Sequence, residues 1–105
     1  MSFNVLFMAH SPDADADLHR SMIDTGKFKL WSVVVRDQVE ALAVAKSLVE
    51  EKQIDSILLC PGFTHQDVAE IVTAFDGQVG VSAARGDGLS NKIAAQARAR
   101  AYGGV

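Results

Sequence analysis

Residues 57–65 read Ile-Leu-Leu-Cys-Pro-Gly-Phe-Thr-His, and this stretch decides the fold. The apolar run before Cys60 is typical of a buried strand, and Pro61-Gly62 ends that strand with a turn. Thr64 is a favoured helix N-cap, and apolar residues follow it at the i, i+3, i+4, i+7 spacing as far as Phe75. The stretch therefore predicts a buried strand, a tight turn and a core-facing helix.

The same alternation extends in both directions along the chain. Apolar runs predict strands at residues 3–9, 28–35, 54–59 and 78–84, and helical patterns lie between them and after the last one. Alternating strands and helices with short connections imply right-handed crossovers and a parallel sheet that is covered on both faces. We therefore predict an α/β fold with a four-stranded parallel sheet in the order 2-1-3-4. This arrangement corresponds to one half of a flavodoxin-like or Rossmann-like three-layer fold.

The segment after the first strand predicts a helix. Ser11 is an N-cap candidate, Pro12 suits the first helical position, and the aspartates that follow favour the positive end of a helix dipole. Leu18 and Met22 then share one helical face, and Thr25-Gly26 supplies a stop. The later helices are expected at residues 37–52, 64–75 and 91–102.

The bulk composition narrows the class of protein. A chain of 105 residues, about half of them apolar, is expected to form one domain over residues 1–105. A net charge of −3 argues against nucleic-acid binding. No signal peptide and no membrane-length apolar run is found, and a single cysteine fits a reducing compartment. We expect a cytoplasmic protein with no membrane partner.

The C-terminal segment differs in charge from the rest of the chain. Residues 85–105 hold four basic residues against Asp87 alone, whereas residues 1–84 carry a net charge of −6. Residues 90–105 are alanine-rich, and we expect a helix or tail there. The mean hydropathy is positive for so small a chain, which favours burial of an apolar face in a homo-oligomer.

The predicted topology gathers several polar residues at one edge of the sheet. His10 and Ser11 follow the first strand, the Cys60 turn follows the third, and Arg85 follows the fourth. Ligands of open α/β sheets bind outside the carboxyl ends of the strands, where the strand order reverses. We therefore expect His10, Ser11 and the Cys60 turn to share one crevice, within reach of Arg85.

The Cys60 turn has the features of an anion site. Gly62 allows close approach to the backbone, and the unpaired N–H groups that begin the next helix favour negative charge. The candidate ligand-binding residues are Ser11, Gly62, Phe63, Thr64, His65 and Arg85. The alternative is that Thr64 only caps its helix and that Pro61-Gly62 only turns the chain.

His10 and Cys60 are the candidate catalytic residues. An imidazole titrates near neutrality, and a thiolate beside a helix N-terminus can act as a nucleophile with His10 or His65 as base. The alternatives are a small buried hydrophobe at Cys60 and polar loop residues at the histidines. No paired Cys or His spacing supports a metal site, so neither a metal nor a cofactor is expected.

Several short motifs together resemble a known family. They are His19-Arg20 with Thr25-Gly26, the stretch 59–63, and residues 79–81 leading to Arg85-Gly86. With them the chain resembles a family of short bacterial proteins known only as a domain of unknown function. The resemblance covers most of residues 1–88 and implies a compact α/β domain, with no activity to carry over to any residue.

Three functions follow as hypotheses of different classes. The leading one is binding of a small anionic metabolite at the carboxyl edge, with His10 as acid–base group if a proton transfer or isomerisation takes place there. The second is a non-catalytic homo-oligomeric interaction module that uses its helices and residues 90–102. The third is a thiol enzyme that uses Cys60.

Overall fold

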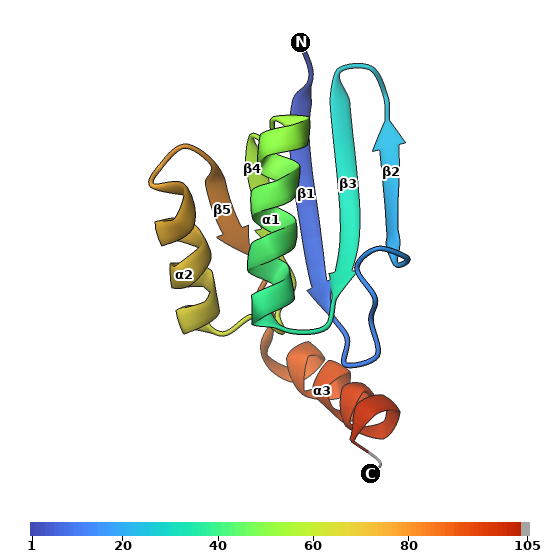
Figure 1. Ribbon diagram of the computed structural model, residues 1–105. Coiled ribbons are helices and arrows are strands. Elements are labelled where there is room, and N and C mark those ends of the chain that lie inside the picture. The colour runs from blue at the N-terminus through green and yellow to red at the C-terminus, as the bar shows by residue number, and fades with distance from the viewer. Residues whose placement is uncertain (104–105) are drawn as a thin grey trace.

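The computed structural model describes residues 1–103, which form five strands and three helices. Figure 1 shows them in chain order. The elements are β1 (Phe3–His10), β2 (Arg20–Asp24), β3 (Phe28–Val35), α1 (Gln38–Lys52), β4 (Ser56–Leu59), α2 (His65–Phe75), β5 (Gly80–Ala83) and α3 (Gly88–Tyr102). The α/β class predicted from the sequence is thus confirmed.

All strands belong to one sheet in the order β2-β3-β1-β4-β5. β3, β1, β4 and β5 are the four predicted strands, and each pairs with its neighbour in parallel. β2 adds a fifth strand at the edge, antiparallel to β3. The four predicted strands keep the predicted relative order 2-1-3-4, but the prediction of a four-stranded, wholly parallel sheet is wrong, because the sheet is five-stranded and mixed.

The extra strand arises where a helix was predicted after Ser11. In residues 11–19 short polar side chains bind the backbone or one another: Asp15 accepts from the N–H of Asp17, and His19 accepts from the N–H of Asp15. Such local bonds compete with helix formation. Thr25-Gly26, expected to stop a helix, instead makes the hairpin turn between β2 and β3, with Gly26 at φ +100° and the Thr25 N–H bound to the Phe28 carbonyl.

One face of the sheet carries the core. Six side chains of β1, β3 and β4 on this face are at most 1% exposed and belong to the same core as buried residues of α1 and α2, which both cover this side (Figure 1). Asp37 caps α1 by accepting from the N–H of Glu40, as the sequence indicates. The buried core of this face comprises Leu6, Met8, Val33, Val35, Ala41, Ala45, Leu48, Ile57, Leu59, Ile71 and Phe75.

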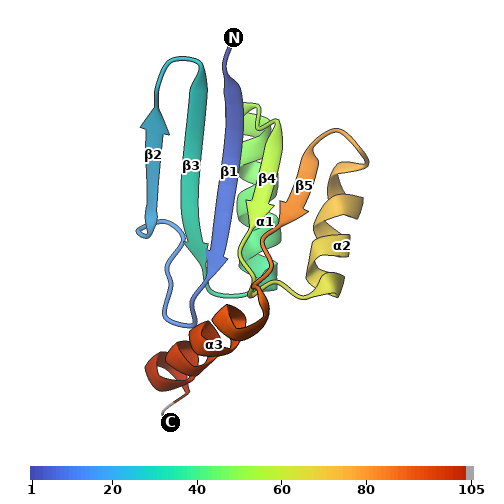
Figure 2. The ribbon, with the colours of Figure 1, turned by 180° about the vertical axis from the view of Figure 1, so that it is seen from behind.

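No helix of residues 1–103 covers the opposite face of the sheet, which Figure 2 turns toward the viewer. Side chains alternate between the two faces of a strand, and Leu6 and Met8 belong to the helix-covered core. Phe3, Val5 and Phe7 therefore belong to the uncovered face, together with their cross-strand partners Leu30 and Leu58. The predicted three-layer architecture is wrong for this reason: no crossover helix joins β1 to β3.

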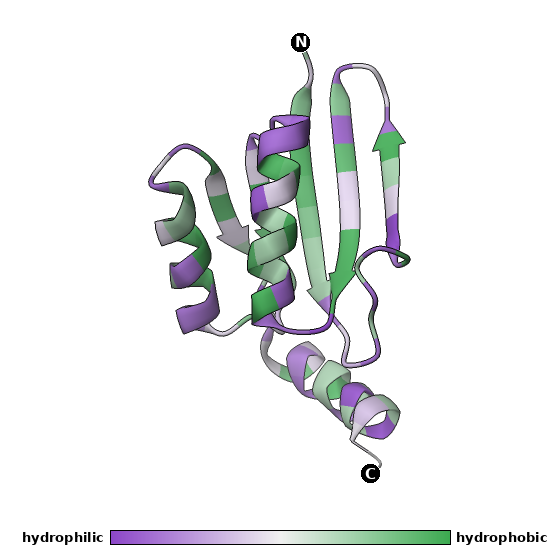
Figure 3. Cartoon of the chain, viewed as in Figure 1, coloured by the Kyte–Doolittle hydropathy of each residue, from purple (hydrophilic) through white to green (hydrophobic). Residues whose placement is uncertain are grey.

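α3 stands apart from the rest of the fold. It lies beyond the carboxyl ends of the strands in both ribbon views and has no buried residue (Figures 1 and 2). Polar and apolar residues alternate along it, whereas β1 is apolar over most of its length (Figure 3). Within residues 1–103, no helix is long and apolar enough to cross a membrane.

Candidate functional site at the carboxyl edge

His10 and Phe63 bring the ends of β1 and β4 together. Their ring centroids are 3.8 Å apart with an interplanar angle of 26°, and the Phe63 side chain is only 1% exposed. The backbone fixes both partners, because the Cys60 N–H donates to the Met8 carbonyl and the Phe63 N–H donates to the Cys60 carbonyl. The predicted meeting of His10 with the Cys60 turn is therefore present in the structure.

Gly62 lies against both candidate catalytic side chains. Its N–H donates to the Cys60 sulfur at 3.4 Å. A Cβ atom at this position would lie 3.3 Å from Cys60 Sγ and 3.6 Å from His10 Nδ1. A methyl group would thus press on the thiol, and glycine at this position lets the turn close on His10 and Cys60.

Arg85 reaches the same turn from the segment after β5. Its Nη1 donates to the Phe63 carbonyl at 2.8 Å, and its Nη2 lies 3.4 Å from Nδ1 of His65. The N–H of Ala84 donates to the Leu59 carbonyl, which aligns this segment with the end of β4. These contacts hold the guanidinium group at the N-terminus of α2, and no ion pair joins it to a carboxylate within residues 1–103.

The N-terminus of α2 is partly occupied by its own cap. Thr64 Oγ1 accepts from the Asp67 N–H, and an Asp67 carboxylate oxygen accepts from the Thr64 N–H, which completes a capping box. The spacing of Thr64 and Asp67 in the sequence predicts this arrangement, and the structure confirms it with Asp in the place of the more usual Glu. Within residues 1–103, the N–H groups of His65 and Gln66 have no hydrogen-bond partner, so they are the two donors left at this helix end.

The remaining predicted residues differ in how far they can serve a ligand. The Ser11 hydroxyl donates to the Asp13 carboxylate, and this bond holds the Asp13 pKa below its ordinary value. His10 Nε2 is buried and has no hydrogen-bond partner within residues 1–103. Cys60 is half-buried, and in the same residues no hydrogen bond links it to a histidine. His10 is therefore the candidate with unused hydrogen-bonding capacity, whereas Ser11 is already engaged.

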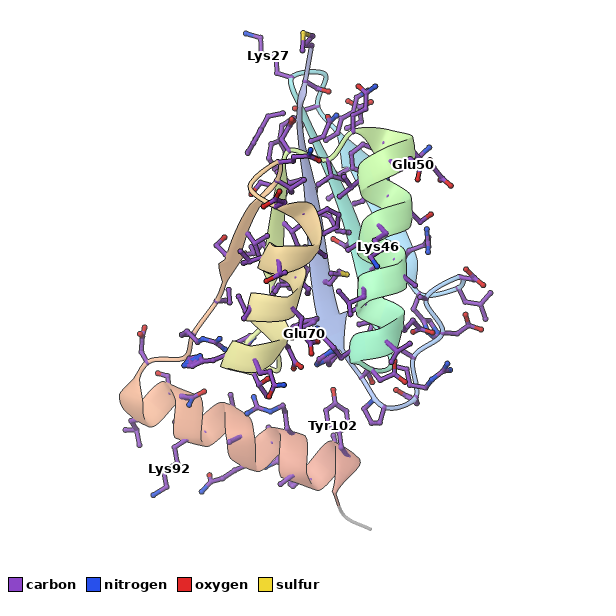
Figure 4. All side chains as sticks on the ribbon, turned by 60° about the vertical axis from the view of Figure 1, so that its left-hand side comes forward. Lys27, Lys46, Glu50, Glu70, Lys92 and Tyr102 are labelled. Atoms are coloured by element: carbon purple, nitrogen blue, oxygen red, sulfur yellow. The ribbon has the colours of Figure 1, made fainter. Side chains whose placement is uncertain are left out.

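Three cavities are lined mainly by residues other than the predicted site residues, although Gln66 at the start of α2 lines one of them. One of about 460 Å³ is lined by residues including Asn4, Lys29 and Lys52, and one of about 270 Å³ lies between the 15–20 segment and α1. The third, about 410 Å³, is a groove between α1 and α2, where Figure 4 shows Lys46 and Glu70. None of the three includes His10, Cys60 or Arg85.

Metal-binding geometry is also absent from the part of the chain that the structure describes, because no three His, Cys, Asp or Glu side chains there are grouped to hold an ion. The His10–Phe63 stack was the feature of the site that sequence reasoning missed. The only sequence signal for it was the position of an aromatic residue and a histidine at the ends of strands predicted to be neighbours.

Comparison with known proteins gives a family and no activity. No curated protein and no solved structure matches this chain significantly. A family model described as a family of unknown function (DUF6506) matches residues 3–99, which include every element from β1 to most of α3. The chain therefore belongs to the DUF6506 family, whose function is unknown.

Proposed function

We propose that this protein binds a small anionic metabolite, a carboxylate or a phosphate, at the carboxyl edge of its sheet. The observation that carries the proposal is the Arg85 guanidinium group, which the Phe63 carbonyl anchors at the N-terminus of α2. An arginine presents five N–H donors in a planar fork. Most of these donors remain available once one has bound the Phe63 carbonyl. That hydrogen bond therefore orients the guanidinium group and leaves donors for a ligand.

The helix end supplies the complementary donors. The free N–H groups of His65 and Gln66 point along the axis of α2 toward its positive end, where anions are stabilised. The Asp67 carboxylate places one negative charge at the same end. Arg85 offsets that charge, so the free N–H groups and the positive end of the helix can attract an anion without net opposition from Asp67.

His10 provides a neighbouring polar atom. Its ring is fixed by stacking on Phe63, and Nε2 is without a partner in the described chain. Phe63 connects the two parts of the site, because its carbonyl accepts from Arg85 and its ring stacks on His10. If the bound molecule reacts, His10 is the group that we propose moves a proton. We also propose that the protein works in a reducing cytoplasm, where the Cys60 thiol is preserved.

Anion titration followed by thermal unfolding and by calorimetry tests the proposal. Phosphate and small di- and tricarboxylates are the probes, and at 100-fold excess over Kd a specific ligand stabilises the fold by about 2.7 kcal/mol. Arg85→Gln is expected to abolish that stabilisation. Lys27→Gln is the matched control, since it removes one positive charge at the opposite end of the sheet, as Figure 4 shows.

The proposal fails if no anion stabilises the protein, or if the two variants respond equally to every anion. A more local readout is the amide NMR shift of His65 and Gln66. These two signals are expected to move on anion addition in the Lys27→Gln protein and to stay unmoved in the Arg85→Gln protein.

A further inference from the structure

α3 lies at the carboxyl edge of the sheet, directly after the arginine of the anion site. The helix begins at Gly88, in the segment that follows Arg85. It starts on the side of β5 and runs below the strand ends toward the side of β2 (Figures 1 and 2). None of its residues is buried. Apolar packing against the body therefore does not explain why the helix lies at this edge.

One side of α3 is turned toward the strand ends. In Figure 4 the Tyr102 side chain points toward the body of the molecule, whereas Lys92 points away from it. Arg98 precedes Tyr102 by one helical turn and Asn91 precedes Arg98 by two, so these three residues share the Tyr102 side. The Asn91 side chain also occupies the place that a Cβ atom at Gly86 would take. This side of α3 therefore lies against the backbone next to Arg85.

The apolar residues of α3 lie on the other side. Ile93 precedes Tyr102 by two and a half turns, which places it on the opposite side of the helix, and Leu89 stands one turn before Ile93. Ile93 is 58% exposed and Leu89 74% exposed. A helix that packs on a protein body turns its apolar side inward. α3 turns its polar side inward instead, which is the orientation expected of a helix that contributes to a polar ligand site.

The side that faces the strand ends leaves room between its polar residues. Between Asn91 and Arg98 it carries only the small side chains of Ala94 and Ala95. The seven residues from Asn91 to Arg98 span about 10 Å along the helix axis. Arg98 is therefore carried at a second point of the same edge, about 10 Å further along α3 than the residue that contacts Gly86.

Two arginines at this edge have no acidic partner. Neither Arg85 nor Arg98 forms an ion pair with a carboxylate within residues 1–103. The other basic residues of the C-terminal segment are Lys92, which points away from the body (Figure 4), and Arg100, which is more than half a turn from Tyr102. The two arginines thus give the edge two uncompensated positive charges, each on a planar fork that suits carboxylates and phosphates.

We propose that Arg98 is a second anion-binding residue, and that the ligand carries two acidic groups at opposite ends. Arg85 and the N-terminus of α2 hold one group, and Arg98 holds the other, with the Tyr102 hydroxyl as a neighbouring donor. This inference rests on the proposed function, because it assigns the far end of the same ligand. The class of ligand is narrowed to molecules with two separated oxyanion groups, such as a bisphosphate or a long dicarboxylate.

Calorimetry with anions of graded length tests the ligand class. Inorganic phosphate and acetate are the probes with one acidic group. Hexane-1,6-diol bisphosphate and the straight-chain dicarboxylates from malonate to octanedioate are the probes with two. The affinity is expected to rise with the separation of the two groups, and the longest probes are expected to bind about 10-fold more tightly than phosphate or acetate, since each adds hydrogen bonds to a charged group. The bisphosphate and octanedioate distinguish a phosphate from a carboxylate ligand.

Arg98→Gln tests the residue, and Lys92→Gln is its matched control. Both substitutions remove one positive charge from an exposed position of the same helix, but only Arg98 shares the Tyr102 side. At 0.15 M salt, charges further apart than about 8 Å are largely screened, so an effect of net charge alone is small and equal in the two variants. Arg98→Gln is expected to lower the affinity for the bisphosphate and octanedioate about 10-fold and to leave phosphate and acetate unchanged. Lys92→Gln is expected to change none of them, and circular dichroism checks that both variants keep their helix content.

The outcomes separate this inference from the proposed function. If Arg85→Gln abolishes phosphate binding while Arg98→Gln and Lys92→Gln affect the bisphosphate equally, Arg98 is not a binding residue and the proposed function stands. Two-group anions that bind no more tightly than phosphate and acetate also overturn the inference alone. A loss with Arg98→Gln that is equal for phosphate and for the bisphosphate excludes a second acidic group. If no anion binds at all, the proposed function fails and this inference fails with it.

Discussion

α2 and α3 begin in similar surroundings but differ in capping and in burial. Both follow a parallel strand and start at the carboxyl edge of the sheet. α2 has a complete capping box and buries Ile71 and Phe75. α3 has Asp87 as its N-cap residue with no side-chain cap bond, and it buries nothing. Although α3 is the longer helix, α2 alone is integrated into the core.

The difference shows that helix propensity and helix packing are separate contributions. Alanine-rich segments favour helix, but an isolated helix of 15 residues is only marginally stable in water. α2 has a lower alanine content and gains stability from the apolar face that it packs into the core beside β5. α3 gains no such contribution from its own fold, because none of its residues is buried.

Core truncation gives the largest expected contrast between the two helices. Ile71→Ala removes a fully buried side chain and is expected to lower the free energy of unfolding by about 2–5 kcal/mol. Ile93→Ala, the matched change in α3, is expected to cost less than about 1 kcal/mol in the monomer because that side chain is exposed.

Urea denaturation followed by Trp31 fluorescence measures both changes, at a protein concentration low enough for the chains to be monomeric. Equal losses from the two substitutions would show that α3 packs on its own body. A loss with Ile93→Ala that appears only as the protein concentration rises would place this side chain against another copy.

Cap removal is expected to give a smaller contrast. Thr64→Ala removes the hydroxyl that accepts from the Asp67 N–H and is expected to destabilise the protein by about 1 kcal/mol. Asp87→Ala removes a side chain that makes no cap bond and is expected to change stability by less than about 0.5 kcal/mol. Thermal unfolding of both variants measures the difference, and a larger loss for Asp87→Ala would contradict it.

The smallest expected effect concerns Ser11 and Asp13, which form a side-chain hydrogen bond without any packed helix. The bond lowers the Asp13 pKa in the folded state, so Ser11→Ala is expected to raise that pKa toward about 3.9. Since the Asp13 pKa is lower in the folded state than in the unfolded state, the bond stabilises the fold at pH values above the unfolded pKa. This contribution is lost as the pH falls through the folded value.

Carboxyl-carbon NMR titration of Asp13 measures this shift, and Ser47→Ala serves as a control that touches neither residue. An Asp13 pKa that Ser11→Ala leaves unchanged would show that the hydroxyl is not the cause. This measurement isolates the contribution of a hydrogen bond, because the Ser11–Asp13 segment has a side-chain hydrogen bond without a packed helix, whereas α2 has both a side-chain cap and a packed face.

The sequence predicted the parts of the fold that local patterns determine. The strand before Cys60, the turn at Pro61-Gly62 and the helix capped by Thr64 all appear, because each has a strong local signal. The four predicted strands were found to within a few residues. The meeting of His10 with the Cys60 turn followed from strand order, since the ends of neighbouring parallel strands share an edge.

β2 could not be predicted in the same way. Leu18 and Met22 have helical spacing, but Met22 pairs with Trp31 in the antiparallel ladder, and that partner lies outside any local window. The sequence predicted both a cap and a ligand contact for the Thr64 hydroxyl, and the structure shows the cap. The position of α3 depends on packing that its own sequence does not supply.

The central place of β1 has a consequence for how the chain folds. β1 is bound on one side by β3, about 25 residues later, and on the other by β4, about 51 residues later in the Val5↔Ser56 register. Doubling the length of a closed loop costs only about 0.6 kcal/mol more, so the later pairing is little harder to close. In chain order, however, β1, β2 and β3 precede every helix of the described residues. A sheet of these three strands alone would be bare on both faces, and α1 is the next element along the chain that can shield one of them.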